Sequence, residues 1–308
     1  MLSRNVRCVG FRSSSQPCYP AAMAAKPQIA IVGPGRLGTA LAVELTRAEY
    51  RVREIISRGS RNSRRRASEL AKLVRARVAT SHNARLDADL IWFCMPDREI
   101  VAAARKLAPL TRWKGKIAFH SSGALASDEL NVLRQHGAVV ASVHPMMTFV
   151  RGSIPSLKGV PFGVEGDAAA VRVARRVVRD LGGEVFTVRK QNKAAYHAWG
   201  AFASPLVVAV LVTAEQVARA VGLSAAEARR KMLPIVRQTV ANYARLGPAG
   251  AFSGPIVRGD AAIVRKHLQV LRKVPGAKEV YVALARVAMH HLPVRNRKQL
   301  EKVLRSAS

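Results

Sequence analysis

The sequence has few acidic and few aromatic residues, and each shortage narrows the range of functions. Only 19 of its 308 residues are Asp or Glu, against 51 Lys and Arg, which gives a formal net charge of +32. Aromatic residues make up 5%, too few to stack nucleic-acid bases, and the basic excess is spread along the whole chain. No zinc-finger, RNA-recognition or helix-turn-helix pattern is present. We therefore expect a small anionic substrate and a basic field that attracts it, rather than a nucleic-acid partner.

Cysteines and long apolar runs are also scarce. Cys8, Cys18 and Cys94 have no metal-binding or redox spacing, which fits a reducing compartment, and we expect no metal site.

The longest uncharged apolar stretch, Ala198–Ala214, is shorter than the about 20 residues of a membrane-spanning helix, and we interpret it as a buried helix. Residues 1–26 contain no acid and no continuous apolar segment, so they are either a transit peptide or an over-long start ahead of Met23. We expect a cytoplasmic protein with no membrane partner.

A glycine-rich turn follows the first apolar run. In QIAIVGPGRLG, Gly33, Gly35 and Gly38 stand between a strand-like run and an apolar helix, and a second strand-like run follows at 51–57. Gly33 permits a tight turn, Gly35 lets backbone N–H groups approach a pyrophosphate, and Gly38 allows the helix to pack closely on the strand. This pattern predicts a dinucleotide-binding Rossmann unit with the anion at a helix N-terminus, against the alternative of a chance glycine-rich turn.

The residues after the second strand favour NADP(H) over NAD(H). No carboxylate stands at the strand tip, where Ser57 is followed by Arg58 and a segment rich in Ser and Arg. An acid there would pair with the ribose hydroxyls of NAD, whereas Arg58 offers a guanidinium to the additional phosphate of NADP. Arg64–Arg66 either contribute to the same site or form the solvated start of the next helix. The residues predicted to bind the cofactor are Gly33, Gly35, Arg36, Leu37, Gly38, Ser57, Arg58, Pro96 and Ser121.

Apolar runs alternate with helical segments up to residue 188, and strand-like runs then disappear. This pattern predicts an α/β fold, with a doubly wound Rossmann-type parallel sheet followed by an all-helical C-terminal domain. The predicted parts are a disordered extension at 1–26, an NADP-binding Rossmann domain at 27–188, and a helical substrate and dimerisation domain at 189–308. Within the last, Ser224 ahead of Glu227 matches a capping box.

Polar residues follow three of the predicted strands. Asp97 follows the fourth strand, the sequence His120–Gly123 follows the fifth, and His144 follows the sixth. Ligands of open α/β sheets bind outside the carboxyl ends of the strands, so we expect these residues near a ligand. The alternatives are that Asp97 caps a helix, that the serines bind only loop backbone, and that each histidine is a satisfied, half-buried residue.

Six motifs together resemble those of a known family, over residues 28–271. They are GPGRLG at 33–38, HSSGAL at 120–125, HPMMTF at 144–149, FGVEGD at 162–167, YHAWGAFASP at 196–205 and GPIVRGD at 254–260. In these motifs the chain resembles the Rossmann-like proteins that carry a helical C-terminal domain of unknown function (domain of unknown function 2520). They belong to the wider superfamily of 6-phosphogluconate and β-hydroxyacid dehydrogenases, pyrroline-5-carboxylate reductases and prephenate dehydrogenases. The resemblance implies an NADP-binding domain, a helical domain that often forms a homodimer interface, and an active site in the cleft between them, but no known substrate.

The chain departs from that superfamily at two points. β-Hydroxyacid dehydrogenases have a catalytic Lys followed four residues later by Asn, whereas here Lys193 is followed by His197, which shares its helix face. His144-Pro145-Met146 is similar to a prephenate dehydrogenase motif, but Met147 replaces the glycine that follows there. An unassigned substrate therefore ranks above both simple hydroxyacids and prephenate.

Hydride transfer between a nicotinamide and a carbonyl or imine carbon needs a proton donor or acceptor at the heteroatom. The candidates for this group are His197, His144 and His120, because an ordinary imidazole titrates near neutral pH. We predict catalytic roles for His197, His144 and Lys193. Arg258 is predicted to bind a substrate carboxylate or phosphate, with Asp260 either holding that arginine or capping the next helix. The residues predicted to bind substrate are His120, Ser122, Gly123, Tyr196, Gly254, Arg258 and Asp260.

We therefore expect a homodimeric NADP(H)-dependent oxidoreductase that transfers hydride to or from a small anionic carbonyl, imine or hydroxy acid. The alternative is a catalytically inactive nucleotide-sensing or scaffolding protein that retains the NADP site, because a fold and a cofactor motif do not guarantee chemistry. A weaker third alternative is a nucleic-acid platform, which would show a steep dependence of binding on salt.

Overall fold

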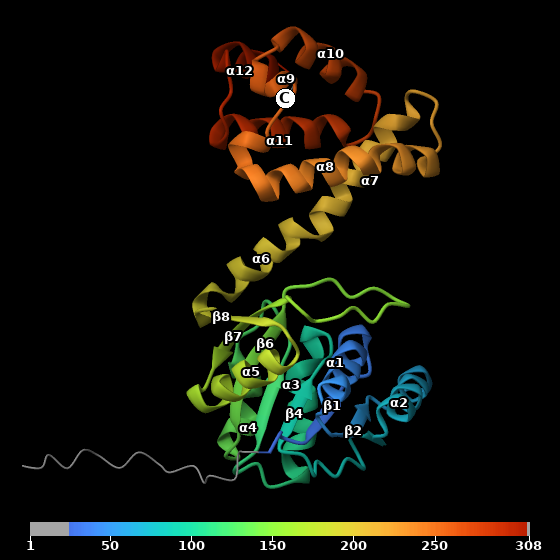
Figure 1. Ribbon diagram of the computed structural model, residues 1–308, viewed down its shortest axis with the longest axis vertical. Coiled ribbons are helices and arrows are strands. Elements are labelled where there is room, and N and C mark those ends of the chain that lie inside the picture. The colour runs from blue at the N-terminus through green and yellow to red at the C-terminus, as the bar shows by residue number, and fades with distance from the viewer. Residues whose placement is uncertain (1–24, 307–308) are drawn as a thin grey trace, which may run out of the picture. The chain divides into compact units, whose positions relative to one another are not determined.

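The computed structural model describes residues 25–306 and is shown in Figure 1. Cys8, Cys18, Met23 and nearly all of the predicted extension at 1–26 lie outside the described residues. The chain divides into two compact units, the first ending at Ala198 and the second beginning at Trp199.

The first unit is built on one eight-stranded sheet with the order β3-β2-β1-β4-β5-β6-β7-β8 (Figure 1). Its strands are β1 (Ile29–Val32), β2 (Val52–Ser57), β3 (Arg77–Thr80), β4 (Leu90–Phe93), β5 (Ile117–His120), β6 (Val139–Pro145), β7 (Pro161–Gly166) and β8 (Glu184–Thr187). All neighbouring pairs are parallel except β6 and β7, which are antiparallel. The chain runs from β1 outward to β3 and then returns to β4 beside β1. This order confirms the predicted doubly wound Rossmann-type sheet and places its crevice at the carboxyl ends of β1 and β4.

Helices cover both faces of this sheet, so the central strands are apolar throughout. In β1, Ile29 and Ile31 pack on one face while Ala30 and Val32 pack on the other, and all four are buried. The first face is covered by α1 (Arg36–Arg47), α2 (Arg61–Val74) and α5 (Ala168–Asp180). The second is covered by α3 (Asp97–Leu107) and α4 (Asn131–Gln135). Short 3-10 turns are η2 (Ala108–Leu110), η3 (Ser127–Leu130) and η4 (Lys190–Asn192).

Strands give way to helices after β8, as predicted. The helices are α6 (Lys193–Ala203), which spans the division between the units, followed by α7 (Pro205–Arg219), α8 (Ala225–Ala251), α9 (Pro255–Arg258), α10 (Ala261–Leu271), α11 (Ala277–His291) and α12 (Arg297–Arg305). Val264, Val282 and Leu300 belong to one buried cluster that joins α10, α11 and α12. The predicted capping box at the start of α8 is confirmed, because Ser224 Oγ accepts from the Glu227 N–H and Glu227 Oε2 accepts from the Ser224 N–H.

The apolar stretch Ala198–Ala214 is not the buried helix that its composition predicted. It runs through α6 and α7, where no residue of α7 is buried, and the side chains of Phe202 and Val208 are 70% and 57% exposed. Residues 190–219 are the one helical stretch in the described part of the chain that could cross a membrane, judged by length and composition only. Hydrophobicity predicts that a helix will be covered, but it does not show what covers it.

Candidate functional site

The glycine-rich turn after β1 leaves no room for side chains. Gly33 has φ +106°, and a Cβ there would lie 2.5 Å from the carbonyl oxygen of Cys94. A Cβ at Gly38 would lie 2.1 Å from the carbonyl oxygen of Gly33, because α1 packs directly against the turn. Glycine at both positions therefore sets the close approach of the helix to the strand that the sequence predicted.

A groove of about 300 Å³ begins at this turn and is here called the Gly35 groove. Gly35 is the N-cap of α1 and makes no side-chain capping hydrogen bond, so the first N–H groups of the helix are open to an anion. Arg58 and Arg66 line the same groove and add positive charge. Its remaining lining residues are Gly33, Pro34, Ser60, Asn62, Ser63, Cys94, Met95 and Pro96. A bound pyrophosphate fits this combination of an uncapped helix N-terminus and guanidinium groups.

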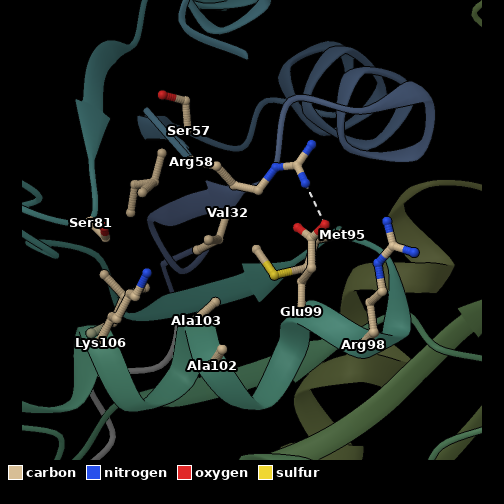
Figure 2. Close-up of a pocket in the computed structure, with 12 residues that line it drawn as sticks. Val32, Ser57, Arg58, Ser81, Met95, Arg98, Glu99, Ala102, Ala103 and Lys106 are labelled. Carbon is tan, nitrogen blue, oxygen red and sulfur yellow. Dashed lines mark hydrogen bonds and ion pairs between the residues drawn. The ribbon is translucent and has the colours of Figure 1, made fainter. Parts of the chain in front are cut away.

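A second cavity, of about 210 Å³, lies beyond the tip of β2 and is here called the Arg58 cavity (Figure 2). It shares Arg58 and Met95 with the Gly35 groove. One part of its wall is apolar and suits a flat ring such as adenine, whereas the polar part suits a ribose and its phosphate. The apolar residues are Val32, Ile56, Met95, Ala102, Ala103 and Leu107, and the polar ones are Ser57, Arg58, Ser81, Arg98, Glu99 and Lys106. The two hollows together fit a dinucleotide.

Three other residues predicted to bind the cofactor line neither the Gly35 groove nor the Arg58 cavity. Arg36 is exposed and donates to the carbonyl oxygen of Phe149, 3.3 Å away, beside a third hollow next to α1. Leu37 packs against the core, which leaves its backbone as the part that could meet a ligand. The Ser121 hydroxyl accepts from Nε1 of Trp92 at 2.7 Å and is hydrogen-bonded to the thiol of Cys94, a residue that lines the Gly35 groove.

Lys193, the first residue of α6, is buried against the ends of β5 and β6. Its Nζ donates to the carbonyl oxygen of Ser122 at 2.9 Å and to Ser142 Oγ at 2.7 Å. Burial lowers the pKa of Lys193 to about 8, although the negative charges of Glu165 and Asp97 act in the opposite direction. An ammonium has three donors, and these two bonds engage two of them while fixing the loop after β5.

Two imidazoles meet above the same loop. His144 Nδ1 is hydrogen-bonded to the Tyr196 hydroxyl at 2.7 Å, and the ring centroids of His144 and His197 are 6.3 Å apart. A Cβ on Gly123 would lie 2.7 Å from His197 Cδ2 and 2.9 Å from His144 Nε2. The two rings therefore pack directly over the Gly123 backbone, where not even a methyl group would fit. We call Gly123, His144, Lys193, Tyr196 and His197 the histidine site.

Burial sets the protonation of this site. It lowers the pKa of His144 to about 4, helped by the positive charge of Lys193 and by the other two histidines, so His144 is neutral at physiological pH. Burial also raises the pKa of Tyr196 to about 12, so its phenol keeps its proton. His197 is exposed, which leaves its imidazole open to solvent and to a ligand.

His120 matches the predicted alternative of a satisfied histidine rather than that of a ligand contact, although it is fully rather than half buried. It is fully buried, its Nε2 bonds to the carbonyl oxygen of Ala126 at 2.9 Å, and its Nδ1 accepts from the Ser122 N–H at 3.1 Å. Burial lowers its pKa to about 4. Both ring nitrogens serve the loop, so we propose no substrate contact for His120. The Ser122 hydroxyl likewise accepts from the backbone N–H groups of Ala124 and Leu125.

Three predicted substrate residues lie in the second unit. Gly254 is the N-cap of α9, Arg258 is the last residue of that helix, and Asp260 caps α10 by accepting from the Ile263 N–H at 3.2 Å. The capping role was one of the two predicted for Asp260. A role of these residues in substrate binding stays a prediction.

Sequence reasoning missed two residues of these sites. Ser142 accepts from Lys193, and it could have been noticed as the polar residue within the apolar run of β6. Glu99 forms an ion pair with Arg58 from a position 41 residues away, and no local pattern signals such a pairing.

The fold is that of a Rossmann-like protein with a helical C-terminal region. A Rossmann-like domain model matches residues 16–145, and the model of a domain of unknown function, DUF2520, matches residues 160–288. The chain belongs to the Rossmann-like proteins that carry this C-terminal domain. No curated protein matches it.

Several solved structures share this fold. A candidate NADP oxidoreductase from Bacteroides fragilis is 23% identical, with a TM-score of 0.72 over 85% of this chain and 97% of that one. An imine reductase from Myxococcus stipitatus in complex with NADP+ is 18% identical, with a TM-score of 0.63 over 86% and 94%. A reductive aminase from Aspergillus terreus in complex with NADPH is 16% identical, with a TM-score of 0.63 over 90% and 99%. At these identities the likeness establishes the fold.

Proposed function

We propose that this protein is an NADP(H)-dependent oxidoreductase that reduces or oxidises a small anionic carbonyl, imine or hydroxy acid. The observation that carries the proposal is that two adjacent residues contact the Gly35 groove and the histidine site. The Ser121 side chain is hydrogen-bonded to Cys94, which lines the Gly35 groove, while the Ser122 carbonyl oxygen accepts from Lys193 of the histidine site. A dinucleotide in the groove and a substrate beside the imidazoles of His144 and His197 would then meet at the carboxyl ends of β4 and β5.

The chain's own residues would supply the proton in this reaction, while a bound nicotinamide would supply or take up the hydride. The protonated Tyr196 phenol can donate to His144 Nδ1, which places the imidazole proton of His144 on Nε2, beside Gly123. We assign proton exchange with the substrate heteroatom to the exposed His197 and hydrogen bonding to the same atom to neutral His144. The Lys193 charge would favour a developing or resident negative charge on the substrate.

The relatives in the comparisons support this class of reaction. The Myxococcus protein is an imine reductase and the Aspergillus protein is a reductive aminase, and both were solved with NADP+ or NADPH. A homodimer in the cytoplasm belongs to the same proposal. The second candidate is a nucleotide sensor without turnover, which would use the Gly35 groove but not the proton-transfer groups of the histidine site.

One two-part experiment separates these functions. NADPH and NADH are titrated calorimetrically into the full chain, and oxidation of NADPH is then followed across a panel of keto acids and cyclic imines. Binding with turnover of a panel member supports the oxidoreductase and gives its substrate class. Binding without any turnover favours the sensor, and failure to bind either nucleotide contradicts both.

A further inference from the structure

The Arg58 guanidinium, at the tip of β2, is paired with a carboxylate. Arg58 forms an ion pair through one of its terminal nitrogens with Oε1 of Glu99, which projects from the first turn of α3 (Figure 2). The Arg58 side chain is 57% exposed, whereas that of Glu99 is 20% exposed. A carboxylate is therefore present where the sequence showed only bases, delivered by a helix rather than by the strand.

The second carboxylate oxygen of Glu99 has no hydrogen-bond partner among the described residues. Oε2 is buried and accepts no hydrogen bond from any residue between 25 and 306. This oxygen has almost no accessible surface, so Glu99 acts on a ligand in the cavity through its negative charge. Glu99 lines the Arg58 cavity, as do Ser57 and Arg58.

Glu99 and Arg58 would act in opposite directions on the two nicotinamide dinucleotides. The additional phosphate of NADP(H) is an anion that a guanidinium binds and a carboxylate repels. NAD(H) has a hydroxyl in its place, which can donate to a carboxylate oxygen and gains little from the arginine. One bond to Glu99 leaves other N–H groups of the Arg58 fork available to a phosphate.

We infer that Glu99 is a specificity-determining residue that offsets Arg58, so that the ribose end of the site discriminates only weakly between NADP(H) and NAD(H). This inference rests on the proposed function, since it concerns the cofactor end of the same site. Glu99 lowers the affinity for the phosphate of NADP(H) by its charge, whereas the uncharged hydroxyl of NAD(H) is not repelled.

The test is the substitution Glu99→Gln, which keeps the shape of the side chain and removes its charge. The matched control is Glu44→Gln, because Glu44 is also ion-paired with an arginine, Arg47, but does not line the Arg58 cavity. Dissociation constants for NADPH, NADH and adenosine 2′,5′-bisphosphate are measured calorimetrically on the wild-type chain and both variants. The bisphosphate reports on the ribose end without a nicotinamide, so its binding does not depend on turnover.

We expect Glu99→Gln to raise the preference for NADPH over NADH about tenfold, the scale of one charge-assisted hydrogen bond. The bisphosphate should bind more tightly by a similar factor at low salt, with the gain shrinking as salt screens the charge. Glu44→Gln should leave both unchanged. An unchanged or reduced preference in Glu99→Gln, with wild-type binding intact, would overturn the inference while leaving the proposed function standing. Failure of the wild-type chain to bind either dinucleotide would overturn both.

Discussion

At the scale of single residues, burial decides which histidines can exchange protons with a substrate. His120 is enclosed, with both ring nitrogens bonded to the backbone, whereas His197 is open. His144 lies between these extremes, with one nitrogen bonded to Tyr196 and the other beside Gly123. Three residues of the same type thus differ in how far a substrate could reach their ring nitrogens.

His120 should make stability depend on pH. Its pKa of about 4 in the folded chain is below the ordinary 6.5, so the unfolded chain takes up a proton that the folded chain does not. The free energy of unfolding should therefore fall as the pH drops from about 6.5 towards 4, with a contribution from His120 of up to about 3 kcal/mol. Urea unfolding at pH 7 and pH 4.5 measures this loss.

The variant His120→Asn should show a smaller loss between these two pH values, because it has no imidazole to protonate. His82, an exposed histidine, provides the control substitution His82→Asn, which should leave the loss as it is in the wild-type chain. Equal pH dependence in His120→Asn and the wild-type chain would show that His120 is not the group responsible.

Gly123 should be essential for turnover but not for nucleotide binding. The Cβ of Gly123→Ala would come within 3 Å of both imidazoles, so one ring must move. We expect turnover of whichever panel substrate is found to fall at least about tenfold, because proton transfer needs hydrogen-bond geometry, while the dissociation constant for NADPH changes little. The control is Gly200→Ala in α6, where an added Cβ meets no atom within 4 Å. Unaltered turnover in Gly123→Ala would show that the packing of the two imidazoles on Gly123 is not part of the proposed site.

The limits of sequence reasoning are clearest among these residues. The sequence brought His144, Tyr196, His197 and Lys193 into one candidate site, since a strand end and a helix face are regular and have readable periods. It did not distinguish His120 from them, because burial depends on side chains from several elements. The Arg58–Glu99 ion pair could not be predicted for the same reason, because it joins the end of β2 to α3, which are distant in the sequence.

At the scale of elements, the alternation of apolar runs and helical segments up to residue 188 predicted the doubly wound sheet. Strand direction was harder to predict: β7 returns antiparallel beside β6, and no helix lies between these two strands. A connection of this length can lead either to an antiparallel strand or, by a crossover, to a parallel one. The length of the 146–160 connection alone therefore did not predict the direction of β7. The junction of β1 and α1 was predicted in detail, because its glycines are required by backbone geometry.

Gly38→Ala should test that junction. The added Cβ would overlap the Gly33 carbonyl oxygen at 2.1 Å, so α1 must move away from the turn that lines the Gly35 groove. We expect the affinity for NADPH to fall at least about tenfold and the free energy of unfolding to fall by about 1 to 3 kcal/mol, the usual cost of overpacking. Calorimetric titration and urea unfolding measure the two effects. The control is Gly115→Ala, whose Cβ meets no atom within 4 Å and which does not line the groove, so that its positive φ affects stability alone. Undiminished NADPH binding by Gly38→Ala would mean that the turn does not position the nucleotide.

At the scale of the whole molecule, the second unit has more exposed apolar surface than a lone soluble chain usually carries. Leu206, Val207, Val208, Val210 and Val212 are all at least 40% exposed on α7, and Ile235, Val240, Tyr243 and Leu246 are exposed on α8. A net charge of +32 opposes non-specific association, so we propose that a specific partner covers this surface. A second copy of the chain is the partner expected from the sequence.

We therefore predict a homodimer whose formation depends on α7. Val208→Arg should shift the protein to a monomer in analytical ultracentrifugation at micromolar concentration, because a guanidinium buried in an apolar interface without a partner is strongly unfavourable. The side chain is 57% exposed in the single chain, so the second unit should still fold, which circular dichroism checks. Leu110→Arg, at an exposed apolar residue of the first unit, is the control and should remain dimeric. A wild-type monomer would show that another partner covers α7, and a Val208→Arg dimer would place the interface elsewhere on the molecule.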